Sequence, residues 1–441
     1  MLRCARLCRH HIARIDQKTA AHLRLAADEQ PRFARHSPLK PDTVGRTEDA
    51  TFAQTPHTTM PDSIDNLVRD LRGARDVNAH YEAIDRLVMR GEFDAAVALA
   101  RAVEERPDIG ADPWALEAVF DRVVRALALC NAHEAASVAL QLGLSPRTQS
   151  TQRARAPLAT ARELAFLLAT GQSNATLSSL LDQLGHHPDF ENVLSCWIQE
   201  VVVRGTDFSH EPSVRRFWGQ LLESHHPLAV LPLSIERIEA ELKDWLPQVR
   251  VGGSSCGMPY GPSRCLDNEP GSFEQIVATE VPTTTGIASV VVNWQEESNG
   301  RAEARKFSFD RPTKPSAVSA GFMKALPLLC LEGVAVEQVV VRPVSIERAL
   351  SILFAASANG GAYNHGRRAA YGRLELWQSV ASLIGHDSIE LEGIANAAAD
   401  WSWYSFDAAS AWFEQVAWDL GIAALSPDAT AMSILAATDI D

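Results

Sequence analysis

A turn-forming residue recurs at a fixed interval through the first half of the chain, and this recurrence restricts the folds open to it. Gly91, Asn131 and Gly171 follow one another at intervals of 40 residues, each between two segments with helical apolar spacing. Gly and Asn tolerate the left-handed backbone of a tight turn better than other residues. A proline, which would stop a helix, follows the second segment of each unit: Pro107, Pro146, Pro188 and Pro227.

Helix pairs at this period predict an N-terminal α-solenoid of helical hairpins. The alternative is an all-helical bundle with accidental spacing. The first unit, residues 80–107, resembles a tetratricopeptide repeat at Gly91, Phe93, Ala96 and Pro107. It departs from that family at Ile84, where Gly is usual, and the later units match loosely. The resemblance implies stacked helix pairs with a concave face that binds peptides.

Composition narrows the class of protein. The net charge of −14 disfavours nucleic acid as a partner, and the apolar content of 46% argues against global disorder. No run of 18 apolar residues exists, so we expect no transmembrane helix. The seven cysteines show no repeated spacing and no secretory signal precedes them, which favours reduced thiols and a cytoplasmic location.

Changes in composition and apolar periodicity along the sequence predict four regions. Residues 1–59 carry little apolar periodicity and are expected to be a disordered or non-native extension, although their arginines also allow a transit peptide. Asp62 or Ser63 is expected to cap a helix that begins at Ile64. Residues 60–248 form the helical-repeat domain, residues 249–272, rich in Gly, Pro and Ser, form a linker loop, and residues 273–441 form a second domain.

The second domain is predicted to be α+β, with a mostly antiparallel sheet. Two hairpins are expected, one joining 287–295 to 303–310 through Asn299-Gly300, and one joining 422–425 to 432–437. Further strands are expected at 273–281 and, more centrally in the sheet, at 334–341. Helices are expected at 316–326, after Ser345 as the capping residue, around Leu374–Leu383, and at 408–420.

One loop between two expected helices, residues 356–373, gathers Gly and Arg in an otherwise acidic protein. Backbone amides of a Gly-rich turn at a helix start, together with Arg, can bind an anion. The loop lacks the phosphate-loop pattern, so the alternative is an inter-helix connection whose arginines pair with acidic neighbours. The candidate ligand-binding residues are Asn359, Gly360, Gly361, His365, Arg367, Arg368 and Arg373.

Other chemical patterns lead to no site. The pairs His186-His187 and His225-His226 lack a recurring acidic or cysteine partner, so no metal is expected. The Trp401–Tyr404 segment could stack a sugar or base, but such aromatics more often build a core. No pair of acids with a defined spacing is recognisable, and no cofactor or catalytic residue is predicted.

Several segments of the last third resemble an actinobacterial family known only as a domain of unknown function. The resemblance implies a helical first half joined to an α+β second half over about residues 60–441, and it implies no substrate, cofactor or catalytic residue. The segments are 357–363, 370–374, 411–413, 416–421 and 435–439.

The leading functional expectation is a protein-binding scaffold or adaptor with a helical groove, rather than an enzyme. One alternative is a small anionic-ligand binder or enzyme that uses loop 357–373. Another is an immunity-like protein that blocks a toxin with its acidic surface. The partner is expected to be a protein, with no membrane or nucleic acid, and the oligomeric state stays open.

Overall fold

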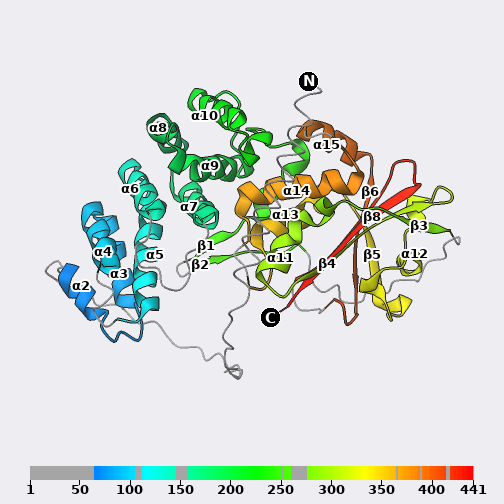
Figure 1. Ribbon diagram of the computed structural model, residues 1–441, viewed down its shortest axis with the longest axis horizontal. Coiled ribbons are helices and arrows are strands. Elements are labelled where there is room, and N and C mark those ends of the chain that lie inside the picture. Colours follow the sequence, from blue (N-terminus) through cyan, green and yellow to red (C-terminus); the bar gives the residue numbers. More distant parts are fainter. Residues whose placement is uncertain are drawn as a thin grey trace, which may run out of the picture. The chain divides into compact units, whose positions relative to one another are not determined.

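Helices fill the first half of the chain and follow one another in pairs (Figure 1). The computed structural model describes residues 64–105, 111–145, 157–250, 253–259, 276–363, 366–387, 390–413 and 418–440. The expected extension 1–59, the capping positions 62 and 63, Pro107 and Pro146 lie outside this part. A short helix, α2 (Ile64–Asp70), precedes the pairs α3 (Asn78–Met89) and α4 (Phe93–Glu105), α5 (Pro113–Leu129) and α6 (His133–Leu144), α7 (Pro157–Gly171) and α8 (Asn174–Leu184), and α9 (Glu191–Val203) and α10 (Pro212–Glu223).

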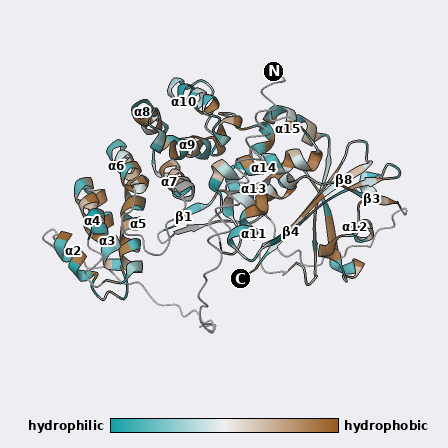
Figure 2. Cartoon of the chain, viewed as in Figure 1, coloured by the Kyte–Doolittle hydropathy of each residue, from teal (hydrophilic) through white to brown (hydrophobic). Residues whose placement is uncertain are grey.

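Capping side chains and a glycine turn set the ends of several of these helices. The Asp112 side chain accepts a hydrogen bond from the Trp114 N–H at the start of α5, and Ser173 accepts one from Thr176 at the start of α8. Gly91, with φ of +74°, makes the left-handed turn after α3. Apolar and polar residues share the surfaces of most of these helices (Figure 2), which bury one side against their neighbours, whereas α9 is buried on all sides from Val193 to Val203.

The helix pairs stack in two layers. The first helices pack in the order α3, α5, α7 and α9, and the second helices in the order α4, α6, α8 and α10. The expected succession of helical hairpins is therefore present, and we call α3–α10 the helix array. Whether its units descend from a sequence repeat stays a prediction.

An antiparallel six-stranded sheet dominates the second half, which confirms the α+β class. The strand order is β3-β4-β8-β7-β6-β5, with every neighbouring pair antiparallel. A short two-stranded hairpin of β1 (Gln248–Arg250) and β2 (Gly253–Ser255) precedes it. The strands are β3 (Ala278–Val281), β4 (Arg301–Phe309), β5 (Val339–Val344), β6 (Ser402–Ala408), β7 (Trp418–Leu425) and β8 (Ala431–Asp439).

Helices cover both faces of this sheet. Helices α13 (Ile346–Asn359) and α14 (Arg368–Ile384) share a buried apolar cluster with Trp403, Ile422 and Leu435 on one face. On the other face α12 (Ala320–Ala325) contributes to a second cluster with Phe307 and Met432. The first cluster continues without a break into the helix array. Helix α14 of the second half packs against α7 and α9 of the first half. A division into two separate domains at residues 249–272 stays a prediction.

The expected hairpin of 287–295 with 303–310 is wrong, since its first half is helical. Residues 285–291 form a 3-10 helix that continues into α11 (Val292–Glu297). Ile287, Val290, Val291 and Trp294 are buried, at the spacing of a helix face. Gly300 donates its N–H to the Trp294 carbonyl at 3.0 Å, so it ends this helical segment before β4 begins.

The helix expected at 408–420 is also wrong. Ala408 ends β6 and Trp418 begins β7, with residues 414–417 outside the described part. The Ser410 hydroxyl accepts hydrogen bonds from the N–H groups of Trp412 and Phe413, which holds the chain in a turn. The helical spacing of the aromatic residues here reflects packing of Phe413 onto Phe406 instead.

The strand expected centrally at 334–341 lies at an edge. β5 spans Val339–Val344, and residues 336–338 form a 3-10 helix. Pro343 has no N–H for a central ladder, and it is tolerated in β5 because this strand has only β6 beside it. β3 is likewise shorter than expected and begins at Ala278, and residues 271–275 lie outside the described part. β6 and α15 (Leu391–Ala399) were not anticipated as elements.

The remaining expectations for this half are confirmed. Ser345 caps α13 by accepting from the Arg348 N–H, and α14 spans the expected apolar stretch. The expected 316–326 helix corresponds to a 3-10 turn at 315–317 followed by α12. The final hairpin joins β7 to β8 and pairs Leu425 with Met432.

Candidate functional site

The Gly/Arg-rich loop joins α13 to α14. Gly360 and Gly366 adopt left-handed backbone conformations, with φ of +82° and +64°. Asp439 of β8 accepts the Ala362 N–H at 2.7 Å and the Ser298 hydroxyl at 2.8 Å, so it ties the loop to the sheet. A Cβ on Gly361 would lie 1.9 Å from the same carboxylate. Asn364 and His365 lie outside the described residues.

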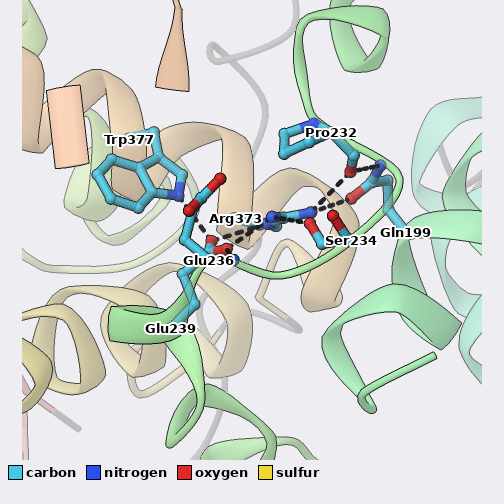
Figure 3. A network of polar contacts seen from close by, with 7 residues as sticks. All are labelled: Gln199, Pro232, Ser234, Glu236, Glu239, Arg373 and Trp377. Atoms are coloured by element: carbon cyan, nitrogen blue, oxygen red, sulfur yellow. Dashed lines mark hydrogen bonds and ion pairs between the residues drawn. The ribbon is translucent and has the colours of Figure 1, made fainter. Parts of the chain in front are cut away.

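Arg373 lies fully buried and uses all its donors within the protein (Figure 3). Its guanidinium donates to both carboxylate oxygens of Glu239, at 2.8 and 2.6 Å. The other donors reach Gln199, the Pro232 carbonyl and the Ser234 carbonyl. Trp377 donates its indole N–H to Glu239 at 2.7 Å. Five donors are thus occupied, which leaves Arg373 nothing to offer a ligand.

Arg368 is also paired with an acid of the protein, through two of its donors. Its guanidinium donates to Glu163 of α7 at 2.6 and 2.9 Å and lies 4.7 Å from the centre of the Phe166 ring. The adjacent Ala369 N–H, in the first turn of α14, donates to the buried Glu200 of α9 at 2.6 Å. A protein carboxylate therefore already lies at this helix start, where a ligand anion was expected.

Asn359 serves as a connector. Its amide donates to the carbonyls of Trp245 and Gly257, both at 3.1 Å, and so fixes residues 245 and 257 against the end of α13. Arg348, about three turns earlier on the same face of α13, donates to the Pro259 carbonyl at 2.6 Å and covers the Trp245 ring. The segment after β2 is thereby anchored to α13. Asn359 thus uses its donors within the protein.

Arg367 differs from its two neighbours, because it belongs to a charged cluster without complete pairing. Its guanidinium lies 3.3 Å from carboxylate oxygens of Glu297 and Glu375. Glu375 also accepts a hydrogen bond from the Ser357 hydroxyl, and burial raises the pKa of this carboxyl. Arg162 and Tyr371 complete what we call the Arg162 cluster, which comprises Arg162, Ser357, Arg367, Tyr371 and Glu375.

Two hollows lie beside the edge strand β5. A cavity of about 280 Å³ has Arg342, Arg348, Ser405 and Asp407 among its lining residues, where β5 and β6 face α13. A second hollow, of about 510 Å³, is lined in part by Pro315, Pro343 and Trp401. Trp403 and Tyr404, considered above as a stacking platform, are buried and donate to the carbonyls of Ala398 and Pro315. Both are packed into the core, and together with Trp401 they also line the second hollow.

No metal centre is found in the described part of the chain, where no three His, Cys, Asp or Glu residues gather suitably. His226 is buried, with Nε2 3.1 Å from the Asn192 side-chain oxygen and Nδ1 accepting from the Leu228 N–H. Among the described helices, none combines the length and apolar character needed to cross a bilayer.

The architecture is that of a helix array in which α7 and α9 pack onto α14, one of the helices that cover the antiparallel sheet. The chain belongs to a family of unknown function, DUF6183, whose model matches residues 78–441. This match confirms the expected membership of a domain of unknown function and does not confirm the tetratricopeptide resemblance. No curated protein and no solved structure matches the chain.

The candidate residues thus separate into connectors and one charged cluster. Arg373, Arg368 and Asn359 join distant segments, and Arg367 lies among charges. Arg162 on α7 was not predicted, because a single Arg in an Ala/Leu-rich helix has no distinguishing spacing. Tyr371 and Glu375 could have been found from their positions, since they follow Arg367, the residue that precedes α14, at intervals of four residues.

Proposed function

We propose that this protein is an adaptor that binds a protein partner through the helix array. The supporting observation is the two-layer stack, in which each helix contacts its counterparts in the neighbouring pairs. Such stacks leave extended faces exposed along their length, and other stacked-hairpin proteins use these faces for binding.

Exposed apolar side chains on the array support the proposal. Met89, Trp114 and Leu222 are 78%, 43% and 55% exposed, respectively, although each is large and apolar. They lie in three different helix pairs, so they mark positions along the array at which a partner could be detected. Single exposed apolar residues are common, and they serve here as probe positions.

The ion pairs of Arg368 and Arg373 would make the binding surface of such an adaptor rigid. Arg368 and Arg373 join α14 to α7, α9 and residues 232–239, and the apolar core is continuous across the same junction. An array held this firmly presents a preorganised surface, which reduces the entropy lost on binding. The same contacts weigh against the alternative ligand site in loop 357–373, since they occupy Arg368 and Arg373.

Site-specific photo-crosslinking tests the proposal. A photoreactive amino acid is placed at Trp114 or Leu222, and at Val277 as a control that is 63% exposed outside the array. We expect one protein to be crosslinked at an array position and not at Val277. That protein, once purified, should bind the wild type, and Trp114→Glu or Leu222→Glu should weaken binding while Val277→Glu leaves it unchanged.

The contrary result is equally clear. If no protein crosslinks at the array in cells, or if the captured protein binds all three Glu variants with the affinity of the wild type, the array is not the docking surface and the adaptor function is wrong.

A further inference from the structure

Arg162 carries a buried guanidinium whose Nε has no acceptor among the described residues. The residue is 7% exposed on α7. Within the described part of the chain, its contact is the ring of Tyr371, whose centre lies 5.8 Å from the guanidinium carbon. A buried charge is costly unless it is paired and hydrogen-bonded, and the carboxylates of Glu375 and Glu297 attract Arg162 while its Nε lacks a hydrogen bond.

A second guanidinium adds to the positive charge. Arg367 has a side chain only 17% exposed, and its Nε lacks hydrogen-bond geometry although Glu375 lies in ion-pair range. Burial lowers the pKa of Arg162, and the nearby charge of Arg367 lowers it further. The two arginines thus share one region with like charge.

The acidic residues nearby offset only part of the positive charge of Arg162 and Arg367. Glu375 is the carboxylate inside the cluster; burial raises its pKa, and the charges of Arg367 and Arg162 and the Ser357 hydrogen bond oppose this rise. Glu297 and Glu296, 3.3 and 3.8 Å from Arg367, are 46% and 51% exposed, so water screens their charges. No hydrogen bond holds the Tyr371 hydroxyl among the described residues, and burial raises its pKa, so it remains a donor.

We propose that the Arg162 cluster binds a small oxyanion, the carboxylate or phosphate group of a ligand. Arg162, the Nε of Arg367 and the Tyr371 hydroxyl all donate, and oxyanions are the acceptors that guanidinium groups bind best. Helices α7 and α14, which carry these donors, pack against each other at the junction of array and sheet. The site uses one of the arginines of the Gly/Arg-rich loop and a partner on α7 that is distant in sequence.

Anion titrations of the full-length protein test the proposal. Inorganic phosphate, sulfate and acetate are each added at constant ionic strength, and the thermal unfolding midpoint and equilibrium dialysis are measured. We expect a saturable rise in the midpoint with at least one anion, because binding to the folded state stabilises it. Phosphate or sulfate binding identifies a phosphate-type ligand, and acetate binding alone identifies a carboxylate.

Two variants make the test specific. Arg162→Met keeps much of the packing volume and should weaken anion binding by about tenfold or more, the usual value of hydrogen bonds to a charged group. Arg216→Met removes an arginine whose side chain is 63% exposed on α10, and should leave binding unchanged. If Arg162→Met does not fold, Tyr371→Phe removes one hydroxyl and should weaken binding several-fold.

Two outcomes overturn the proposal. One is the absence of saturable binding with all three anions. The other is a rise of equal size in wild type, Arg162→Met, Tyr371→Phe and Arg216→Met, which would reflect a general effect of salt.

Discussion

Arg373 and Glu239 form an ion pair in which both side chains are fully buried, although they lie 134 residues apart in the sequence. The carboxylate accepts both guanidinium bonds and the indole N–H of Trp377 (Figure 3). The pair joins α14 to the segment that follows the helix array. A buried pair of this kind is expensive to break, because either partner alone would be an uncompensated charge.

Arg373→Met should therefore lower the free energy of unfolding by about 3–5 kcal/mol, measured by urea denaturation. Glu239→Gln should have a similar effect, and the double variant should lose less than the sum of the two. Arg216→Met, which breaks an exposed pair with Asp182, should cost about 1 kcal/mol or less. A loss at Arg373 as small as this control would show that the pair does not hold the junction.

Gly171 should not tolerate a methyl group. A Cβ there would lie 2.4 Å from the Leu129 Cα and 2.6 Å from the Ala128 carbonyl oxygen, both of them backbone atoms of α5. Gly171→Ala should destabilise the protein by about 1–3 kcal/mol, because the turn after α7 must move away from α5. Thermal and urea unfolding measure the change.

Gly219 supplies the matched control for that substitution. It lies inside α10, and nothing is found within 4 Å of its Cβ position. Gly219→Ala should stabilise the protein by about 0.5–1 kcal/mol, through helix propensity alone. Equal effects at the two positions would contradict the close approach of α7 to α5.

Stability should fall as the pH drops below about 6.5, partly because of His226. Burial lowers the pKa of this histidine below its ordinary value of 6.5. The unfolded chain therefore binds a proton more readily, so the loss of stability grows as the pH falls from the unfolded pKa to the lowered folded pKa and is complete below it. Protonation would also abolish the hydrogen bond that Nδ1 accepts from the Leu228 N–H.

Urea denaturation at pH values from 5 to 8 measures this dependence. His226→Gln should make the fall in stability shallower, whatever its effect at neutral pH. His186→Gln, at an exposed position, should keep the slope of the wild type. If the slopes of His226→Gln and wild type coincide, His226 does not contribute to the pH dependence.

Ser345→Ala should cost about 1 kcal/mol, since the Ser345 hydroxyl accepts the Arg348 N–H at the start of α13. Ser316→Ala, at an exposed serine in a 3-10 turn, is a suitable control and should change the free energy of unfolding very little. Chemical denaturation distinguishes the two, and equal small effects would show that the cap is dispensable.

Local signals in the sequence predicted the helix pairs, the cap at Ser345 and the final hairpin. These features depend on residues close together, such as Gly91 after α3, and so they are visible without coordinates. The 287–295 segment was misread because β-branched residues favour strands, whereas its buried residues follow a helical period. The edge position of β5 depends on long-range pairing, to which Pro343 was the one available clue.

The candidate site was predicted only in part, for a similar reason. The Gly/Arg-rich pattern identified a junction, but not which arginine would lack a partner. The acids that contact α14 come from other segments, and their local sequence does not predict these contacts. They are Glu239, Glu163 and Glu200. Because Arg368 and Arg373 pair with such distant acids, these two predicted ligand contacts instead join segments of the protein.

The strand order has a consequence for synthesis on the ribosome. β4 lies between β3 and β8, and Arg301 of β4 pairs with Thr438 of β8. Most of one edge of β4 therefore stays unpaired in the nascent chain until β8 has emerged, and contacts so distant in sequence form slowly. We therefore expect the exposed edge of β4 to be the part of the nascent chain most prone to pairing with other chains.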